Sequence, residues 1–207
     1  GISLMVVETD KADGFRRGRK LEKIGMKASD TSELFFDDVE IPPENLLGGE
    51  AGQGFYQMMQ QLPQERLIIA CGAVGAMEGA VERTVTYCKE REAFGGPLTQ
   101  FQNTRFKLAD LKALIEVNKA FCAQCTDQYD LAELTAVNAS IAKLTTTELQ
   151  AKVADECLQL FGGYGYMKEY PVEKMMRDAK ILQIYEGTNQ IQRNVIGQAL
   201  NKEYSRR

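Results

Sequence analysis

Apolar residues recur every seven positions between residues 99 and 129, and this stripe limits how the chain can fold more than any other feature. Seven residues make close to two turns of an α-helix, so the whole set lies on one helical face. The stripe consists of Phe101, Leu108, Ile115, Cys122 and Tyr129, with Leu111 and Cys125 on companion positions. A helix this long needs other helices to cover its apolar face, which predicts a bundle.

Three other segments have helical spacing of their apolar residues, which predicts helices over about 53–90, 131–161 and 188–203. Glycines and a proline at 95–97 end the first helix, polar residues at 127–130 mark a turn, and glycines and tyrosines at 162–166 end the third. Four helices with short connections favour an antiparallel four-helix bundle.

The residues before the helices have the composition of β-strands. Segments 2–7 and 33–41 are rich in apolar, aromatic and β-branched residues, and Pro42 and Pro43 end the strand region because neither can donate a ladder hydrogen bond. The glycine-rich segment 48–54 is a flexible connection. The expected fold is therefore mainly α, with a partial β-domain of a few antiparallel strands at 1–50 and the helical bundle domain at 51–207.

The start of the chain, Gly1 to Val7, has no initiator Met, no basic region and no small-residue cleavage site. These features argue against a signal or transit peptide. We expect a fragment that starts inside a strand.

Composition excludes several classes of function. The chain has 207 residues, 44% of them hydrophobic, with a formal net charge of -4. We therefore expect a soluble protein with no basic field for nucleic acid and no membrane span. The five cysteines are too few and too scattered for a disulfide-stapled domain, and the absence of histidine removes the commonest general base and metal ligand. Acid–base chemistry must use carboxylates, Tyr, Lys, Cys or a cofactor.

Two cysteines have the C-x-x-C spacing of zinc and redox sites, at Cys122 and Cys125. They lie on the apolar face of a predicted helix, without a second pair or a histidine. We interpret them as core residues and predict no metal site.

Two further motifs stay open on spacing alone. Arg91, beside Phe94 at a helix end, suits a diphosphate, but an Arg in the last turn also complements the helix dipole. The glycines at 162–165 follow a helix rather than a strand, so they are a helix cap whose backbone could also approach a cofactor closely.

Glu186 lies between Tyr185 and Gly187, just before the last predicted helix. A carboxylate near a helix start is usually a dipole or capping feature. Between an aromatic residue and a glycine it could instead be a desolvated general base. Spacing does not choose between the two.

Four motifs in order resemble the acyl-CoA dehydrogenase family over almost the whole chain. The matching stretches are 23–31 with 35–39, then 91–102, then 159–163, and finally 177–180 with 185–192. The resemblance implies the end of a middle β-domain followed by a C-terminal four-helix bundle.

The resemblance implies FAD as the cofactor. Arg91 matches the family arginine that meets the FAD diphosphate, with Phe94 and Gln102 nearby. Further matches lie elsewhere: Gln159, Gly162 and Gly163 match the segment that reaches the adenosine half of FAD from a neighbouring subunit, and Thr188 and Gln190 match further flavin contacts. A homodimer that shares the FAD site, within a tetramer, is thus expected.

The resemblance also implies oxidation of an acyl-CoA thioester to trans-2-enoyl-CoA. Glu186 matches the base that removes the α-proton while the β-hydrogen leaves as hydride to the flavin, and Arg66, Tyr185 and Gly187 match substrate-binding positions. Backbone N–H of the base residue and a flavin ribityl hydroxyl hold the thioester oxygen in this family. Glu65 occupies the position from which the long-chain and isovaleryl branches supply their base. We favour Glu186, with Glu65 as the alternative.

The family relation implies that electrons pass to an electron-transferring flavoprotein. The compartment would be the cytoplasm in a bacterium and the mitochondrial matrix in a eukaryote. Two alternatives are an acyl-CoA oxidase-like activity and, for the fragment alone, an inert helical oligomerisation scaffold.

Overall fold

The computed structural model describes residues 1–205, which form two compact units divided between Leu62 and Pro63. This division falls inside the first long helix. The sequence predicts a domain boundary at residue 50, in the glycine-rich segment, and that boundary stays a prediction.

The first unit contains one antiparallel pair of strands, β1 (Phe15–Lys20) and β2 (Ser32–Phe36). Phe15 pairs with Phe36 in the register, and their rings pack with centroids 5.2 Å apart. The register shifts between Arg17 and Lys20, and the short helix η1 (Pro43–Asn45) follows the pair.

The strand expected over residues 2–7 does not form. Only isolated bridges occur there, from Ile2 to Gln53 and from Met5 to Leu46. The backbone of this segment bonds to the loop instead, since the N–H of Val6 donates to the carbonyl of Asn45 at 2.9 Å. Residues 2–7 are therefore extended, and hydrogen bonds to a loop hold them in place of a strand partner.

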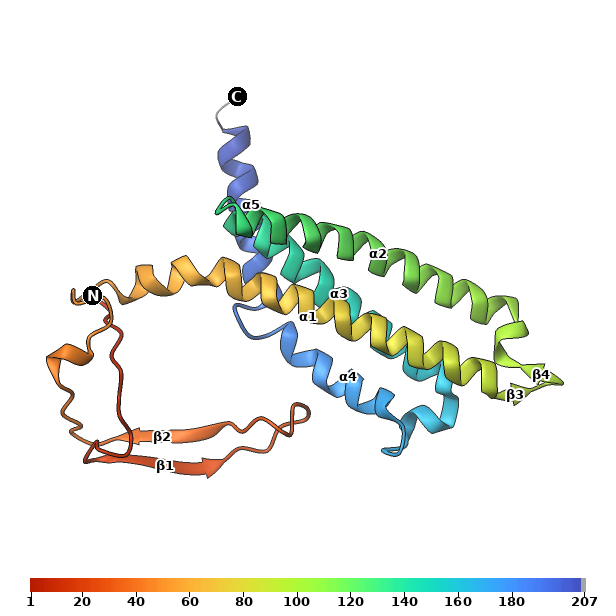
Figure 1. The fold of residues 1–207 in the computed structure, drawn as a ribbon, viewed down its shortest axis with the longest axis horizontal. Helices are drawn as coiled ribbons and strands as arrows, with labels where there is room; N and C mark the ends of the chain where they lie inside the picture. Colours follow the sequence, from red (N-terminus) through yellow and green to blue (C-terminus); the bar gives the residue numbers. More distant parts are fainter. Residues whose placement is uncertain (206–207) are drawn as a thin grey trace. The chain divides into compact units, whose positions relative to one another are not determined.

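The second unit is helical, and its helices and connections follow the predicted order closely. The helices are α1 (Gly54–Glu90), α2 (Gln102–Asp130), α3 (Ala136–Phe161), α4 (Pro171–Leu182) and α5 (Asn189–Tyr204). A hairpin of β3 (Glu92–Ala93) and β4 (Gly96–Pro97), then η2 (Leu98–Gln100), joins α1 to α2, and η3 (Gly162–Tyr166) joins α3 to α4. The second half of α1 and helices α2 to α4 alternate in direction, and α5 turns away from them (Figure 1).

Helix α4 was not expected from the sequence. Pro171 stands in its first turn, where a missing N–H costs nothing, and Val172 and Ala179 bury its apolar face. The antiparallel bundle predicted from four helices is thus present, with α4 as its fourth member and α5 as an additional helix.

The core lies where α1, α2 and α3 meet. Met77, Ile115 and Val153 are almost completely buried, one from each helix. Cys122 and Cys125 belong to the same core and carry free thiols, and burial raises the pKa of Cys122 to about 12. The C-x-x-C spacing is therefore core filling, as expected. No helix among residues 1–205 combines the length and the apolar character needed to cross a membrane.

Candidate active site

Glu186 stands in the short loop between α4 and α5, with a backbone conformation that is unusual for its residue type. Its φ is 53° and that of Gly187 is 85°, so two successive residues are left-handed. For a residue with a side chain this conformation costs on the order of 1–2 kcal/mol. The N–H of Asn189 donates to the carbonyl of Gln183 at 3.0 Å and closes the loop.

Side chains from three helices hold the carbonyl groups of this loop. Gln192 of α5 donates to the carbonyls of Glu186 at 3.2 Å and Gly187 at 2.8 Å. Arg66 of α1 also donates to the Glu186 carbonyl, at 3.4 Å, and Lys143 of α3 donates to the Gly187 carbonyl at 2.9 Å. Because all three side chains are buried, the loop is bound to the bundle rather than to solvent.

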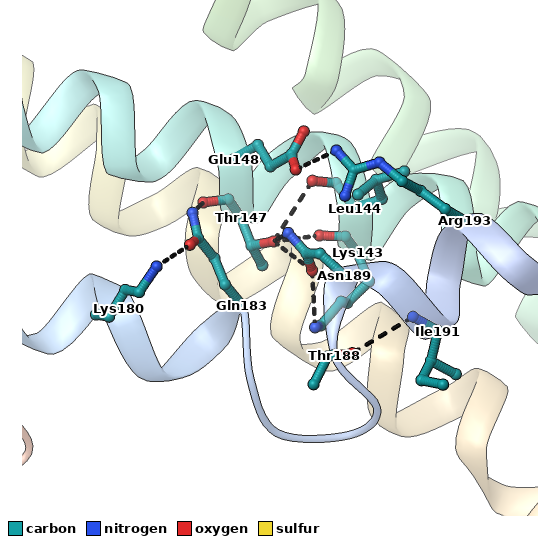
Figure 2. A network of polar contacts seen from close by, with 10 residues as sticks. All are labelled: Lys143, Leu144, Thr147, Glu148, Lys180, Gln183, Thr188, Asn189, Ile191 and Arg193. Atoms are coloured by element: carbon teal, nitrogen blue, oxygen red, sulfur yellow. Dashed lines mark hydrogen bonds and ion pairs between the residues drawn. The ribbon is translucent and has the colours of Figure 1, made fainter.

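A buried polar network continues from Lys143 to Thr147 and Asn189 (Figure 2). The Lys143 ammonium donates to Asn189 Oδ1 at 3.0 Å, and Asn189 Nδ2 donates to Thr147 Oγ1 at 3.1 Å. Gln183 Nε2 donates to the Thr147 carbonyl at 3.2 Å. Both ends of the loop are therefore tied to one turn of α3.

Two carboxyl groups meet at this end of the bundle. A hydrogen bond with Glu65 is the largest cause that raises the pKa of Glu186, followed by burial and by the charge of Glu65. Arg66 and Lys143 act in the opposite direction on the same carboxyl. The Glu186 carboxyl therefore stays neutral to a higher pH than an isolated Glu.

The two cations beside the pair are also perturbed. Burial lowers the pKa of Arg66, and burial with the neighbouring Arg66 charge lowers the pKa of Lys143 to about 8. Tyr185 next to Glu186 has a raised pKa because of burial and the Glu186 charge.

The N–H groups of Glu186 and Gly187 make no hydrogen bond with any residue in 1–205. These two donors lie beside the raised-pKa carboxyl. A Cβ at Gly187 would come within 3.0 Å of Gln192 Nε2, so its φ and its space both favour glycine. The arrangement offers a base and backbone donors for a developing oxyanion in one place.

The other predicted residues of this end have distinct surroundings. Thr188 caps α5, since its hydroxyl accepts from the N–H of Ile191 at 3.4 Å, and Gln190 is exposed. Arg66, predicted in the substrate channel, is 5% exposed and also donates to Ser140 Oγ at 3.3 Å.

The remaining predicted residues lie at the opposite end of the bundle. The ends of α1 and α3 meet there, because Tyr87 stacks on Phe161 with ring centroids 4.0 Å apart. The predicted residues at this end are all exposed: Arg91, Phe94, Gln102, Gln159, Gly162 and Gly163. We call this set the distal cluster.

The distal cluster is far from Glu186 within one chain. Arg66 and Glu90 are 24 positions apart in α1, which corresponds to roughly 36 Å at 1.5 Å per residue. The Arg91 guanidinium lies 5.4 Å from the Tyr164 ring centroid and forms no ion pair with a carboxylate in the described part of the chain.

Sequence reasoning missed Ser140, Lys143, Thr147 and Gln192, which hold the loop. Three of them have a detectable signal, because Ser140, Lys143 and Thr147 are polar residues that repeat at spacings of three and four in one helix. Polar residues at core spacing indicate a buried network.

The comparisons with known proteins agree with the resemblance. Residues 52–201 match the family model described as acyl-CoA dehydrogenase, C-terminal domain. The chain is 48% identical to the long-chain specific acyl-CoA dehydrogenase of Mus musculus mitochondria, over 97% of this chain and 46% of that protein. It is 46% identical to the short-chain specific acyl-CoA dehydrogenase of Megasphaera elsdenii, over 97% of this chain and 52% of that protein.

Solved structures give the same picture. The acyl-CoA dehydrogenase of Geobacillus kaustophilus matches with a TM-score of 0.94 and 43% identity, over 97% of this chain and 52% of that one. A chain in a structure described as the electron transferring flavoprotein of Acidaminococcus fermentans matches with a TM-score of 0.92 and 40% identity, over 97% of this chain and 52% of that one. The chain spans about half the length of the relatives it matches.

Proposed function

This chain belongs to the acyl-CoA dehydrogenase family, and on that premise we propose that the complete protein oxidises an acyl-CoA thioester to its trans-2-enoyl-CoA. The observation that carries the proposal is the position of Glu186. Its carboxyl has a raised pKa and stands beside two backbone N–H donors that no described residue uses.

Glu186 is the proposed base for the α-proton of the thioester. Such a proton is a very weak acid, so the site must both strengthen the base and stabilise the enolate that forms. The hydrogen bond with Glu65 and burial make Glu186 a stronger base than a solvated carboxylate. The Glu186 N–H is the proposed donor to the thioester oxygen, where the negative charge develops.

Members of this family are FAD flavoproteins, and FAD, when bound, supplies the acceptor for the β-hydride. The distal cluster fits its diphosphate. The Arg91 guanidinium is exposed and has no carboxylate partner among residues 1–205, which leaves its donors available for a phosphate. A Cβ at Gly162 or Gly163 would meet nothing within 4 Å, so there is open space against this backbone.

The length of the bundle supports a site shared between two subunits. With roughly 36 Å between the two ends, the distal cluster of one chain and Glu186 of the same chain would belong to different FAD molecules. We propose a homodimer in which each FAD meets Glu186, Thr188 and Gln190 from one subunit and the distal cluster of its partner. A tetramer would pair two such dimers.

The proposed electron acceptor is an electron-transferring flavoprotein, since one structural relative comes from the structure of such a flavoprotein. The proposed compartment follows the relatives, which include mitochondrial and bacterial enzymes. It is the matrix in a eukaryote and the cytoplasm in a bacterium.

The test uses the full-length protein with FAD and a series of acyl-CoA chain lengths. Wild type should bleach the flavin absorbance anaerobically with at least one substrate. Glu186→Gln should lower the bleaching rate by about 10²–10⁴-fold, the usual share of a general base. The matched variant Glu65→Gln should retain bleaching. Loss in Glu65→Gln with full activity in Glu186→Gln would move the base to Glu65.

A further inference from the structure

Lys143 is completely buried, yet no carboxylate of the described residues is hydrogen-bonded to it. Its exposed fraction is 0%, and its ammonium donates to two neutral oxygens, the Gly187 carbonyl and Asn189 Oδ1. Burying a charged amine costs several kcal/mol unless strong partners compensate. The desolvation of Lys143 therefore lowers the stability of the fold.

Stability alone does not require it. Gly187 O also accepts from Gln192, and Asn189 Oδ1 also accepts from the Thr147 hydroxyl at 3.3 Å. Neither oxygen would lose its only partner if the amine were absent. An apolar side chain of similar length could fill the same volume at lower desolvation cost.

What the amine adds is a rigid link to the left-handed turn. Gly187 directly follows Glu186, and the carbonyl that Lys143 holds lies at the end of the two-residue turn with φ of 53° and 85°. Lys143 bonds this turn to α3, while Arg66 bonds it to α1 and Gln192 bonds it to α5. Three helices thus fix the orientation of one strained segment.

We propose that Lys143 is a positioning residue for Glu186: its bonds to Gly187 and Asn189 hold the turn in the orientation from which the carboxyl and its N–H face the substrate. This inference rests on the proposed role of Glu186 as the base. Lys143 does not itself touch the reacting atoms.

The charge of Lys143 gives the proposal a distinctive signature. The charged groups that act on Glu186 are Glu65 and Arg66 from α1 and Lys143 from α3, while Gln192 from α5 is uncharged. The adjacent Tyr185 has a pKa that burial and the Glu186 charge raise. A nearby cation stabilises the carboxylate, so removing it raises the pKa of Glu186 further. The rate of flavin reduction falls at low pH where Glu186 becomes protonated, and we call this part of the pH profile the acid limb. The acid limb must then move to higher pH.

The experiment compares Lys143→Met and Lys143→Arg in the full-length enzyme with FAD. The rate of flavin reduction by saturating acyl-CoA is measured against pH. In Lys143→Met we expect about a hundredfold loss, the usual cost of a misplacement near 1 Å, and an acid limb shifted to higher pH. In Lys143→Arg, which keeps the charge and the donors, the limb should stay in place and part of the rate should return.

Hydrogen–deuterium exchange without substrate provides a readout independent of turnover. Exchange at 183–189 should rise in Lys143→Met, with the core of α2 unchanged. The matched control is Lys107→Met, which removes a half-buried lysine that is paired with Glu156 between α2 and α3. It should alter neither the profile nor exchange at 183–189.

The outcomes separate the inference from the proposed function. In one outcome, acyl-CoA reduces the flavin of the wild type while Lys143→Met keeps the wild-type rate, pH profile and hydrogen–deuterium exchange. In that case the positioning role of Lys143 is wrong and the proposed function stands. If no acyl-CoA of the series reduces the flavin of the wild-type enzyme, the proposed function is wrong. Faster hydrogen–deuterium exchange at 183–189 in Lys143→Met would still support the structural link between Lys143 and the loop. If Lys143→Met does not fold, Lys143→Arg decides: an acid limb that moves upward in this variant overturns the proposal.

Discussion

Glu65 of α1 acts more strongly than any other group on the Glu186 carboxyl, since its hydrogen-bonding group and its charge both raise the pKa of Glu186. Glu65 comes from α1 and Glu186 from the loop after α4, so the pair is formed only when the second unit is folded. The resemblance to the family places alternative positions of the base at these two residues, and this chain has a glutamate at both. Their coupling makes the pH dependence of the site a direct probe of its structure.

The first prediction concerns Glu65→Gln. This change removes the negative charge that raises the pKa of Glu186 and leaves an amide that can still donate to the carboxylate. The acid limb of flavin reduction should therefore move to lower pH, with activity retained at neutral pH. Stopped-flow reduction between pH 5 and 8 measures it. Glu78→Gln, on the same helix and paired with Lys119, is the control, and an unmoved limb in Glu65→Gln would show that the pair is not coupled.

The second prediction concerns stability. A folded-state pKa raised above the unfolded value stabilises the fold below the unfolded pKa, and this contribution is lost as the pH rises through the folded pKa. Glu186→Gln cannot ionise, so it should melt above wild type at pH 8, with the difference shrinking toward pH 4. Thermal unfolding at both pH values tests the sign. A variant that melts below wild type at pH 8 would contradict the raised pKa.

The third prediction concerns the network in Figure 2. Asn189→Ala removes the amide that links Lys143 to Thr147 and leaves a buried ammonium with one acceptor fewer. The variant should lose about 1–3 kcal/mol of unfolding free energy in urea. Asn194→Ala, at an exposed position of the same helix α5, should change it by less than about 0.5 kcal/mol. Equal losses in the two variants would mean that helix propensity, and not the network, dominates.

The fourth prediction concerns the shared site. Arg91→Ala damages the distal cluster and Glu186→Gln damages the base, so each variant alone should be inactive. In a hybrid dimer, one of the two sites would receive both intact halves. Subunits mixed one to one and reassembled should recover about a quarter of wild-type activity, since half of the dimers are hybrids with one good site. Activity no greater than that of the separate variants would mean that Arg91 and Glu186 of one chain serve the same FAD, which contradicts the shared site.

Much of the helical architecture followed from apolar spacing. The segment predicted over 53–90 matches α1 (Gly54–Glu90), and the stripe from Leu108 to Tyr129 lies in α2 with Ile115 almost fully buried. Long amphipathic helices repeat their signal many times, so the period is clear. Helix α4 has only about three turns, so its apolar residues repeat too few times to give a clear period. The glycines and motif residues around it, in segment 162–187, favour a loop instead.

The site was less predictable for a different reason. Glu186 and Glu65 both follow from the resemblance, but the effect of Glu65 on the pKa of Glu186 depends on where α1 and the loop meet in space. Lys143 taken alone does not stand out in the sequence, because a lysine in a helical segment is usually on its solvated face, and only its spacing with Ser140 and Thr147 gives a signal. Only the structure shows that this one is buried against Gly187. Spacing along one helix does not tell which group of another segment a buried side chain contacts.

Because the backbone of Glu186 is left-handed, selection for stability and selection for activity favour different residues at position 186. A library screened for thermal stability alone would favour glycine or asparagine at 186, since these residues adopt a φ near 53° most readily. A library screened for turnover should keep the carboxylate and accept the backbone cost. Enrichment ratios at position 186 would therefore move in opposite directions in the two screens, and directed evolution toward heat resistance should reach this position early unless activity is selected in parallel.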